Sequence, residues 1–180
     1  MRFVGTPLNQ VWIVEVEPVE DGRGFFARTW CTREFAAHGL NPQLAQCNVS
    51  WNRAKGTVRG MHYQRPPHEE AKVVRCTRGA IYDVVIDLRP ASPSFCAWFG
   101  LELSATGRHL VYVPEGCAHG FQTLEDDCEV LYQMTAEHVS AAADGVRWND
   151  PAFGVRWPLP VTLISDKDAG YADFDRARVR

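Results

Sequence analysis

Two histidines lie in short stretches bounded by glycine and proline. His62 stands six positions after Gly56, and His119 closes a Pro-x-Gly-x-x-His stretch that begins at Pro114. An imidazole has an ordinary pKa of about 6.5, so it is the side chain best matched to proton transfer near neutral pH. If the fold brings the two stretches together, the chain holds a site that moves protons.

Two cations and a phenol accompany these histidines. Arg59 precedes His62 by three residues, Lys72 follows on the next expected strand, and Tyr132 lies on a later one. A cation stabilises negative charge that develops on a substrate oxygen, and a phenol with an ordinary pKa of about 10 remains a proton donor. A base, an acid and two cations in one cavity would form a coherent set for acid–base chemistry.

These side chains must be positioned by short strands, because runs rich in Val, Ile, Tyr and Trp alternate with Gly and Pro along most of the chain. Strands are expected at residues 11–17, 24–30, 43–50, 57–64, 71–77, 80–88, 95–103, 109–113 and 129–135. One short connecting helix is expected at 33–38, with Thr32 as its N-cap and Gly39 at its end. The pattern favours an all-β jelly roll with a ligand in its mouth.

Strand geometry raises one difficulty for Arg59 and His62. In a regular strand an odd spacing places two side chains on opposite faces. Gly60 lies between them, and a glycine inside a strand often marks a β-bulge. We therefore expect irregular pairing at Gly60.

Beyond about residue 141 the alternation of apolar and polar residues stops. Phe153 and the tryptophans in this segment predict a C-terminal tail packed on the barrel.

Composition narrows the class of protein. The chain has 180 residues, 46% hydrophobic and 23% charged, with a formal net charge of −3. This favours one folded domain over residues 1–180, with neither a nucleic acid nor a membrane as partner. The six scattered cysteines and the lack of a long apolar segment at the start favour a cytoplasmic location.

The two histidine stretches, 56–64 and 114–121, resemble the paired motifs of the cupin superfamily. In metal-dependent cupins the first motif reads His-x-His followed by Glu, whereas here the second histidine is replaced by Gln64. A catalytic metal normally has at least three protein ligands, and Glu69 or Glu70 would have to supply the third. The sequence favours a metal-free site and leaves a metal-dependent cupin oxygenase as an alternative.

A closer resemblance covers residues 10–170. The matching motifs are 21–26, 46–48, 58–64, 72–75, 83–89, 92–93, 114–116, 118–121 and 148–151. Together they resemble the dTDP-4-dehydrorhamnose 3,5-epimerases. The resemblance implies a cupin-type double-stranded β-helix without cofactor or metal and a homodimer. It also implies inversion of carbons 3 and 5 of dTDP-4-dehydro-6-deoxyglucose, a nucleotide sugar.

The same resemblance implies a role for individual residues. His62 matches the general base, Asp168 the carboxylate that orients it, Tyr132 the acid on the opposite face, and Lys72 the cation beside the ketone oxygen. The substrate-binding residues that it implies are Arg23, Phe26, Arg28, Gln46, Asn48, Arg59, Lys72, Asp83, His119 and His138. Arg23 would reach the site from the N-terminal strands of the partner subunit.

Two departures from the family pattern fall at the nucleotide end. His138 stands where many members have a tyrosine that stacks on the base, and Arg28 stands where a glutamate is frequent. They leave open which nucleotide is preferred. A single-centre epimerase or a 3,4-ketoisomerase of another 4-keto-6-deoxyhexose is an alternative within the same chemistry, and a non-catalytic nucleotide-sugar binding module is a further one.

Overall fold

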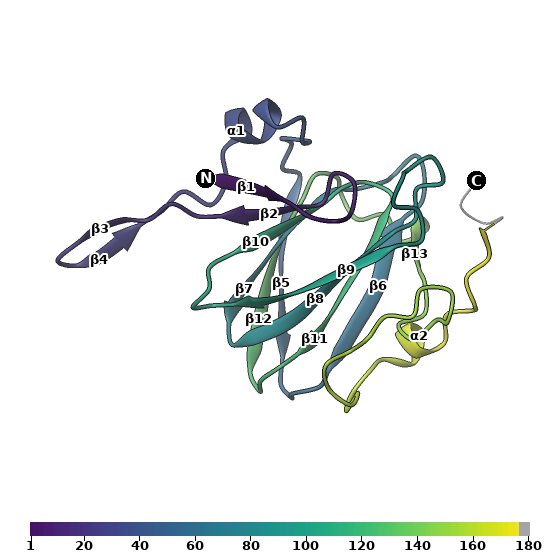
Figure 1. Cartoon of the computed structure of the whole chain (residues 1–180). Helices are drawn as coiled ribbons and strands as arrows, with labels where there is room; N and C mark the ends of the chain where they lie inside the picture. Colours follow the sequence, from purple (N-terminus) through teal and green to yellow (C-terminus); the bar gives the residue numbers. More distant parts are fainter. Residues whose placement is uncertain (177–180) are drawn as a thin grey trace.

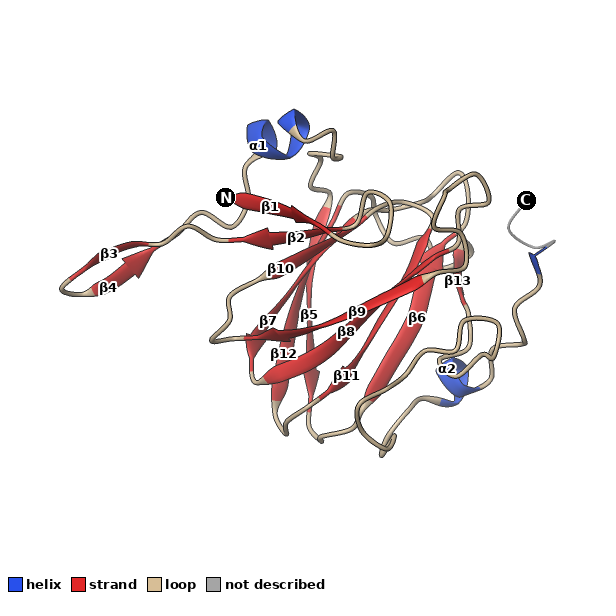
Figure 2. Ribbon diagram, in the orientation of Figure 1, coloured by secondary structure: helices blue, strands red, loops and turns tan. Residues whose placement is uncertain are grey.

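Strands are the main regular secondary structure of the computed structural model, which describes residues 1–176 (Figures 1 and 2). A six-stranded antiparallel sheet has the order β1-β2-β10-β7-β12-β5, and a five-stranded one has the order β13-β6-β11-β8-β9. The strands of the first sheet are β1 (Arg2–Gly5), β2 (Trp12–Glu15), β10 (Leu110–Val113), β7 (Lys72–Arg78), β12 (Cys128–Met134) and β5 (Gln46–Asn52). Those of the second are β13 (Ala143–Gly145), β6 (Val58–Gln64), β11 (Cys117–Thr123), β8 (Ala80–Asp87) and β9 (Trp98–Ser104). The two facing sheets form the expected cupin-type jelly roll.

The hydrophobic core lies between the two sheets. Every second residue of β7 enters it, so Val74 and Cys76 pack against Val130 of β12 and Phe121 of β11. All four side chains are fully buried. Strand alternation then directs Lys72, two residues before Val74, to the same interior face. The polar site and the apolar core therefore share one barrel interior.

The segment after β13 covers the outer face of the five-stranded sheet. Val146 and Phe153 join Val84 and Ile86 of β8 in a second apolar cluster, against which Trp157 packs. The expected C-terminal tail on the barrel is thus confirmed. Its last element is the short helix α2 (Asp166–Ala169), which contacts β6.

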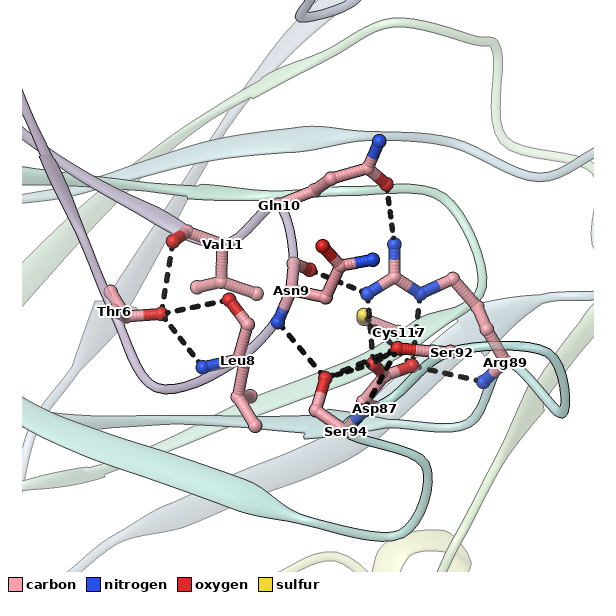
Figure 3. Close-up of polar contacts among 10 residues, drawn as sticks. All are labelled: Thr6, Leu8, Asn9, Gln10, Val11, Asp87, Arg89, Ser92, Ser94 and Cys117. Carbon is pink, nitrogen blue, oxygen red and sulfur yellow. Dashed lines mark hydrogen bonds and ion pairs between the residues drawn. The ribbon is translucent and has the colours of Figure 1, made fainter.

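A loop near the N-terminus is tied to the barrel by a buried ionic cluster (Figure 3). Asp87, at the end of β8, is fully buried and pairs with Arg89 at 2.8 Å. Arg89 also donates to the carbonyl of Asn9 at 2.6 Å, and the hydroxyl of Ser94 accepts from the backbone N–H of Asn9 at 2.9 Å. These bonds hold the loop between β1 and β2 against the barrel.

A hairpin of β3 (Val19–Asp21) and β4 (Gly24–Phe26) projects away from the barrel, to the left in Figure 1, and helix α1 (Thr32–Ala37) follows it in the chain. Its side chains are exposed, and Phe26 is 78% accessible. In one chain the hairpin therefore stays largely exposed, although the guanidinium of Arg108 lies 4.2 Å from the centre of the Phe25 ring.

Several expected boundaries were wrong. The helix begins at Thr32, so Thr32 is not its N-cap; Cys31 takes that extended position without a side-chain cap bond. The strand expected at 24–30 ends at Phe26, because the chain turns from the hairpin toward α1, where Trp30 packs on Phe35. Elements that the strand pattern did not predict are β1, β3, β11, β13 and α2. Among residues 1–176, no helix is long and apolar enough to cross a membrane.

Candidate active site

A cavity of about 310 Å³ opens at the interior of the barrel. Both sheets line it: β5, β7 and β12 from one side, β6 and β11 from the other. The predicted site residues that it brings together are Asn48, Arg59, His62, Lys72, His119, Tyr132 and His138. Residues from strands far apart in the sequence thus meet around one space of a size suited to a sugar.

His62 of β6 is held by a buried carboxylate from α2. Its Nε2 lies 2.7 Å from Oδ1 of Asp168, and Oδ2 of Asp168 accepts from the backbone N–H of Gly60 at 3.1 Å. Asp168 is itself fixed at the start of α2, where its N–H donates to the Ser165 hydroxyl. The structure therefore joins His62 and Asp168, although 106 positions separate them in the sequence.

This pairing decides which nitrogen of His62 is left able to accept a proton. Because a carboxylate accepts at Nε2, the hydrogen of the neutral imidazole resides there and Nδ1 keeps its lone pair. Burial alone would raise the pKa of Asp168, but the hydrogen bond and charge of His62 and the Gly60 N–H outweigh it, and the pKa is lowered. Asp168 thus stays ionised and can stabilise a protonated His62.

The expected irregularity at Gly60 is confirmed. His119 of β11 pairs with His62 and Phe121 pairs with Arg59, so two steps on β11 correspond to three on β6. Gly60 has a φ of +135°, and a Cβ there would lie 2.6 Å from Cα of Gly120. The extra residue brings both Arg59 and His62 to the cavity, which regular alternation would forbid.

A second histidine–carboxylate pair lies deeper in the wall. Nε2 of His119 is 2.7 Å from Oδ2 of Asp83 on β8, and both side chains are buried. Oδ1 of Asp83 has no hydrogen-bond partner among residues 1–176. The ring of His119 stands edge-on to Tyr132, with centroids 6.0 Å apart.

Lys72 is a buried cation at the cavity wall. Its Nζ lies 3.1 Å from Oε1 of Glu70 and donates to the carbonyl oxygen of His62 at 3.0 Å. Burial lowers the pKa of Lys72, while the charges of Glu70 and Asp83 oppose that shift. An ammonium with three donors and two acceptors in place retains one donor for a ligand.

Tyr132 enters the cavity from the sheet opposite to His62. It lies on β12, two residues after Val130 and on the same face of the strand. Its cross-strand partner on β5 is Asn48. Burial raises the pKa of its phenol, as does the charge of Asp83, whereas Arg59 acts in the other direction. The phenol therefore remains protonated and able to donate.

Six predicted residues do not line this cavity within one chain. Asp83 and Asp168 contact its histidines from behind, and the other four are Arg23, Phe26, Arg28 and Gln46. Arg23 and Phe26 are on the projecting hairpin, where Arg23 pairs with Asp21. Arg28 pairs with Glu34 of α1 at 2.7 Å. Gln46 lies at the rim, where its Oε1 accepts from the backbone N–H of His138 at 2.9 Å.

Sequence reasoning missed three charged residues that line the cavity, namely Glu70, Asp144 and Lys167. Glu70 was considered only as a metal ligand, yet it pairs with Lys72 and lines the cavity. Lys167 lines it beside Asp168. The i, i+2 spacing of Glu70 and Lys72 could have indicated the first, since such residues share one face of an extended segment. Within residues 1–176 no group of three or more His, Cys, Asp or Glu side chains is arranged to hold a metal ion.

The fold and the site together define a cupin-type barrel built for proton transfer. The family model for dTDP-4-dehydrorhamnose 3,5-epimerase matches residues 5–176. The chain therefore belongs to the dTDP-4-dehydrorhamnose 3,5-epimerase family. It is 37% identical to the dTDP-4-dehydrorhamnose 3,5-epimerase of Shigella flexneri, over 97% of this chain and 96% of that protein.

Solved structures agree with this assignment. The dTDP-4-dehydrorhamnose 3,5-epimerase of Elizabethkingia anophelis superposes with a TM-score of 0.94 at 34% identity, over 97% of this chain and 96% of that chain. ChmJ, a 3'-monoepimerase from Streptomyces bikiniensis solved in complex with dTDP-quinovose, superposes with a TM-score of 0.84 at 31% identity, over 93% and 85%. The same fold thus occurs in enzymes that differ in how many carbons they invert.

Proposed function

We propose that this chain is an epimerase that inverts carbons 3 and 5 of dTDP-4-dehydro-6-deoxy-D-glucose to give dTDP-4-dehydro-L-rhamnose, without cofactor or metal. Its family membership supports the activity, which is that of an isomerase acting on a nucleotide sugar. The observation that carries the mechanism is the placement of a carboxylate-paired histidine and a phenol on opposite sheets of one cavity.

In this mechanism His62 is the base. Carbons 3 and 5 both neighbour the ketone at carbon 4, so their hydrogens are acidic. Nδ1 of His62 takes the proton, the C–H electron pair forms a carbon–carbon double bond, and the carbonyl pair moves to the oxygen. Lys72 uses its remaining donor on that oxygen, and a preorganised donor in a dry site commonly contributes about 3–4 kcal/mol.

Inversion requires that the proton return from the other face. One base cannot reach both faces of a sugar ring, so Tyr132, on the opposite sheet, supplies the second proton and the carbanion becomes a C–H bond again. The charge of Arg59 favours the phenolate that remains and assists its formation. His119, oriented by Asp83, is assigned to the sugar as a further donor near the oxygen.

We assign the nucleotide part of the substrate to the rim of the cavity. Arg59 is held by Asn52, whose Oδ1 accepts from Nε at 2.6 Å, which leaves the terminal nitrogens for the diphosphate. Asn48, Gln46 and His138 line the approach to the sugar and the nucleoside. A thymidine nucleotide is proposed here on the strength of the family, with His138 as the ring nearest the base.

Proton NMR in deuterated water tests this function. Mixed with dTDP-4-dehydro-6-deoxyglucose, the enzyme should exchange the hydrogens at carbons 3 and 5 for deuterium. A rhamnose-forming reductase then captures the doubly inverted product. An enzyme that binds the nucleotide sugar and exchanges neither hydrogen would be a binding module, and the proposal would fail.

A single-centre epimerase is the second candidate. The observation in its favour is the superposition on the 3'-monoepimerase from Streptomyces bikiniensis, which uses the same barrel. Exchange at carbon 3 alone identifies this activity. A 3,4-ketoisomerase would instead move the carbonyl to carbon 3, which the carbon chemical shifts of the product reveal.

The partner subunit is proposed to complete the site. The hairpin β3–β4 leaves Val19 71% and Phe26 78% exposed, and the edge strand β5 exposes Val49 and Trp51. Exposed apolar side chains on a projecting hairpin and a free sheet edge are the features that a second chain covers. We therefore propose a homodimer in which Arg23, Phe26 and Arg28 of each chain serve the neighbouring nucleotide site.

Subunit complementation tests the dimer. Chains carrying Arg23→Ala and His62→Ala are each expected to be impaired, but a mixed dimer holds one site with both native residues. Mixing equal amounts should restore about a quarter of wild-type activity, because half of the dimers are mixed and each has one complete site. A mixture no more active than the mean of the two variants contradicts the shared site.

The cytoplasmic location of the protein also stays a prediction, and cell fractionation checks it.

A further inference from the structure

One buried carboxylate in the cavity wall has no role in the mechanism above. The side chain of Glu70 is 4% exposed and lines the cavity. Oε1 meets Lys72, but Oε2 has no hydrogen-bond partner among residues 1–176. Leaving a charged oxygen buried and unpaired costs more than an ordinary lost hydrogen bond, so such an atom is expected to have a partner in the working state.

The position of Glu70 relative to Lys72 limits what that partner can be. Nζ of Lys72 lies 3.1 Å from Oε1 of Glu70, so a ligand oxygen that accepts from Lys72 lies close to the same carboxylate. The last torsion of a glutamate side chain is broad, which lets the carboxylate turn Oε2 toward the cavity. An ammonium donor beside a carboxylate acceptor matches a ligand with a carbonyl beside a hydroxyl, that is, an α-hydroxyketone.

We propose that Glu70 is a specificity-determining residue that accepts a hydrogen bond from the hydroxyl at carbon 3 of the sugar while Lys72 holds the neighbouring ketone oxygen. This inference rests on the proposed function and deepens it. The substrate class becomes a 4-ketosugar with a free hydroxyl at carbon 3, which a 3-deoxy or 3-O-alkyl sugar lacks.

The contact favours one of the two proton transfers. When His62 takes the proton from carbon 3, the electron pair forms a double bond between carbons 3 and 4, and both oxygens come to lie in the plane of that enediolate. Glu70 and Lys72 then bind adjacent coplanar oxygens. When the proton leaves carbon 5, the double bond forms on the other side of the carbonyl, and the hydroxyl at carbon 3 takes no part in it. Glu70 should therefore support exchange at carbon 3 more than at carbon 5.

The variant Glu70→Gln keeps the volume of the side chain and an acceptor for Lys72 but turns an amide NH₂ toward the hydroxyl. In deuterated water, exchange at carbon 3 should fall about 10- to 100-fold relative to exchange at carbon 5, the factor for losing a hydrogen bond to a charged group. The ratio is measured in one spectrum, so a change in the amount of folded enzyme cancels. If the variant only weakened the contact of Glu70 with Lys72, exchange at carbons 3 and 5 would slow by the same factor, because both reactions place negative charge on the same carbonyl oxygen.

A 3-deoxy analogue of the substrate tests whether the effect of Glu70→Gln depends on the hydroxyl at carbon 3. Without the hydroxyl, the wild-type enzyme and Glu70→Gln should show the same ratio of exchange at carbon 3 to carbon 5. The matched control is Glu69→Gln, the same change at the half-buried neighbouring residue, which does not line this cavity; it should leave the ratio unchanged with the natural substrate.

The outcomes separate the two proposals. If the wild-type enzyme exchanges both hydrogens and Glu70→Gln slows both by the same factor, or neither, the inference about Glu70 is wrong and the epimerase stands. If the wild-type enzyme exchanges neither hydrogen, the proposed function itself fails, and the inference fails with it.

Discussion

The pair of His62 and Asp168 gives the sharpest prediction. In the variant Asp168→Asn the size and shape of the side chain are kept, but only one oxygen can accept. The native carboxylate accepts from two donors, His62 Nε2 at 2.7 Å and the Gly60 N–H at 3.1 Å. An asparagine can serve one of them and must present its NH₂ group to the other.

Both orientations of the amide are costly. If its oxygen faces His62, the buried N–H of Gly60 is left facing an NH₂ group, which costs about 1–3 kcal/mol of stability. If its oxygen faces Gly60, the NH₂ group donates to Nε2, the imidazole hydrogen moves to Nδ1, and the base loses its lone pair at the working nitrogen. We expect the exchange rate at both carbons to fall by about 10³- to 10⁴-fold, the loss typical of a wrong tautomer.

The assay combines deuterium exchange with urea denaturation, and Asp166→Asn, an exposed position in the first turn of the same helix, is the control. The pKa of Asp168 is lowered below its ordinary value of 3.8, so its ionised form stabilises the fold above that pH. The stability lost in Asp168→Asn should be full near neutral pH and shrink as the pH falls through the folded-state pKa. Exchange within tenfold of wild type, with unchanged stability, would refute this account of the pair.

Three further predictions follow from the same site. Tyr132→Phe should keep deuterium exchange, because His62 still removes the proton, but should reduce formation of the inverted product at least about 100-fold, as reductase capture measures. Gly60→Ala should lower the free energy of unfolding by about 1–3 kcal/mol because of the φ of +135° alone, and by more because the added Cβ would lie 2.6 Å from Gly120. Urea denaturation measures this loss. Gly22→Ala is the control, because a Cβ at Gly22 meets nothing within 4 Å. Treatment with a chelator and assay in metal-free buffer should leave the activity unchanged, whereas a metal-dependent oxygenase would lose it.

Particular residues show which features of the site could be predicted from the sequence. The alternation of β7 and β12 could be read directly, because a period of two fixes which side chains share a face; Lys72 and Tyr132 therefore belong to the interior with Val74 and Val130. The bulge at Gly60 was predictable for the same reason, since Arg59 and His62 cannot share a face of a regular strand. By contrast, β11 was not predicted as a strand, because its Cys-Ala-His-Gly-Phe sequence lacks a β-branched residue and carries a glycine.

Sequence alone determined the kind of chemistry and the period of the strands, since both depend on residue types and on spacings within one segment. The family resemblance implied that Asp168 orients His62 and that Tyr132 faces it, but only the tertiary structure decided the contacts between these distant segments. It joined Asp168 of α2 to His62, set His119 against Asp83, and placed Tyr132 and His62 on opposite sheets. It also left Arg23 and Phe26 on a projecting hairpin. The physical reason is that a pairing across 106 positions depends on which faces of two sheets bury each other, and no local pattern records that.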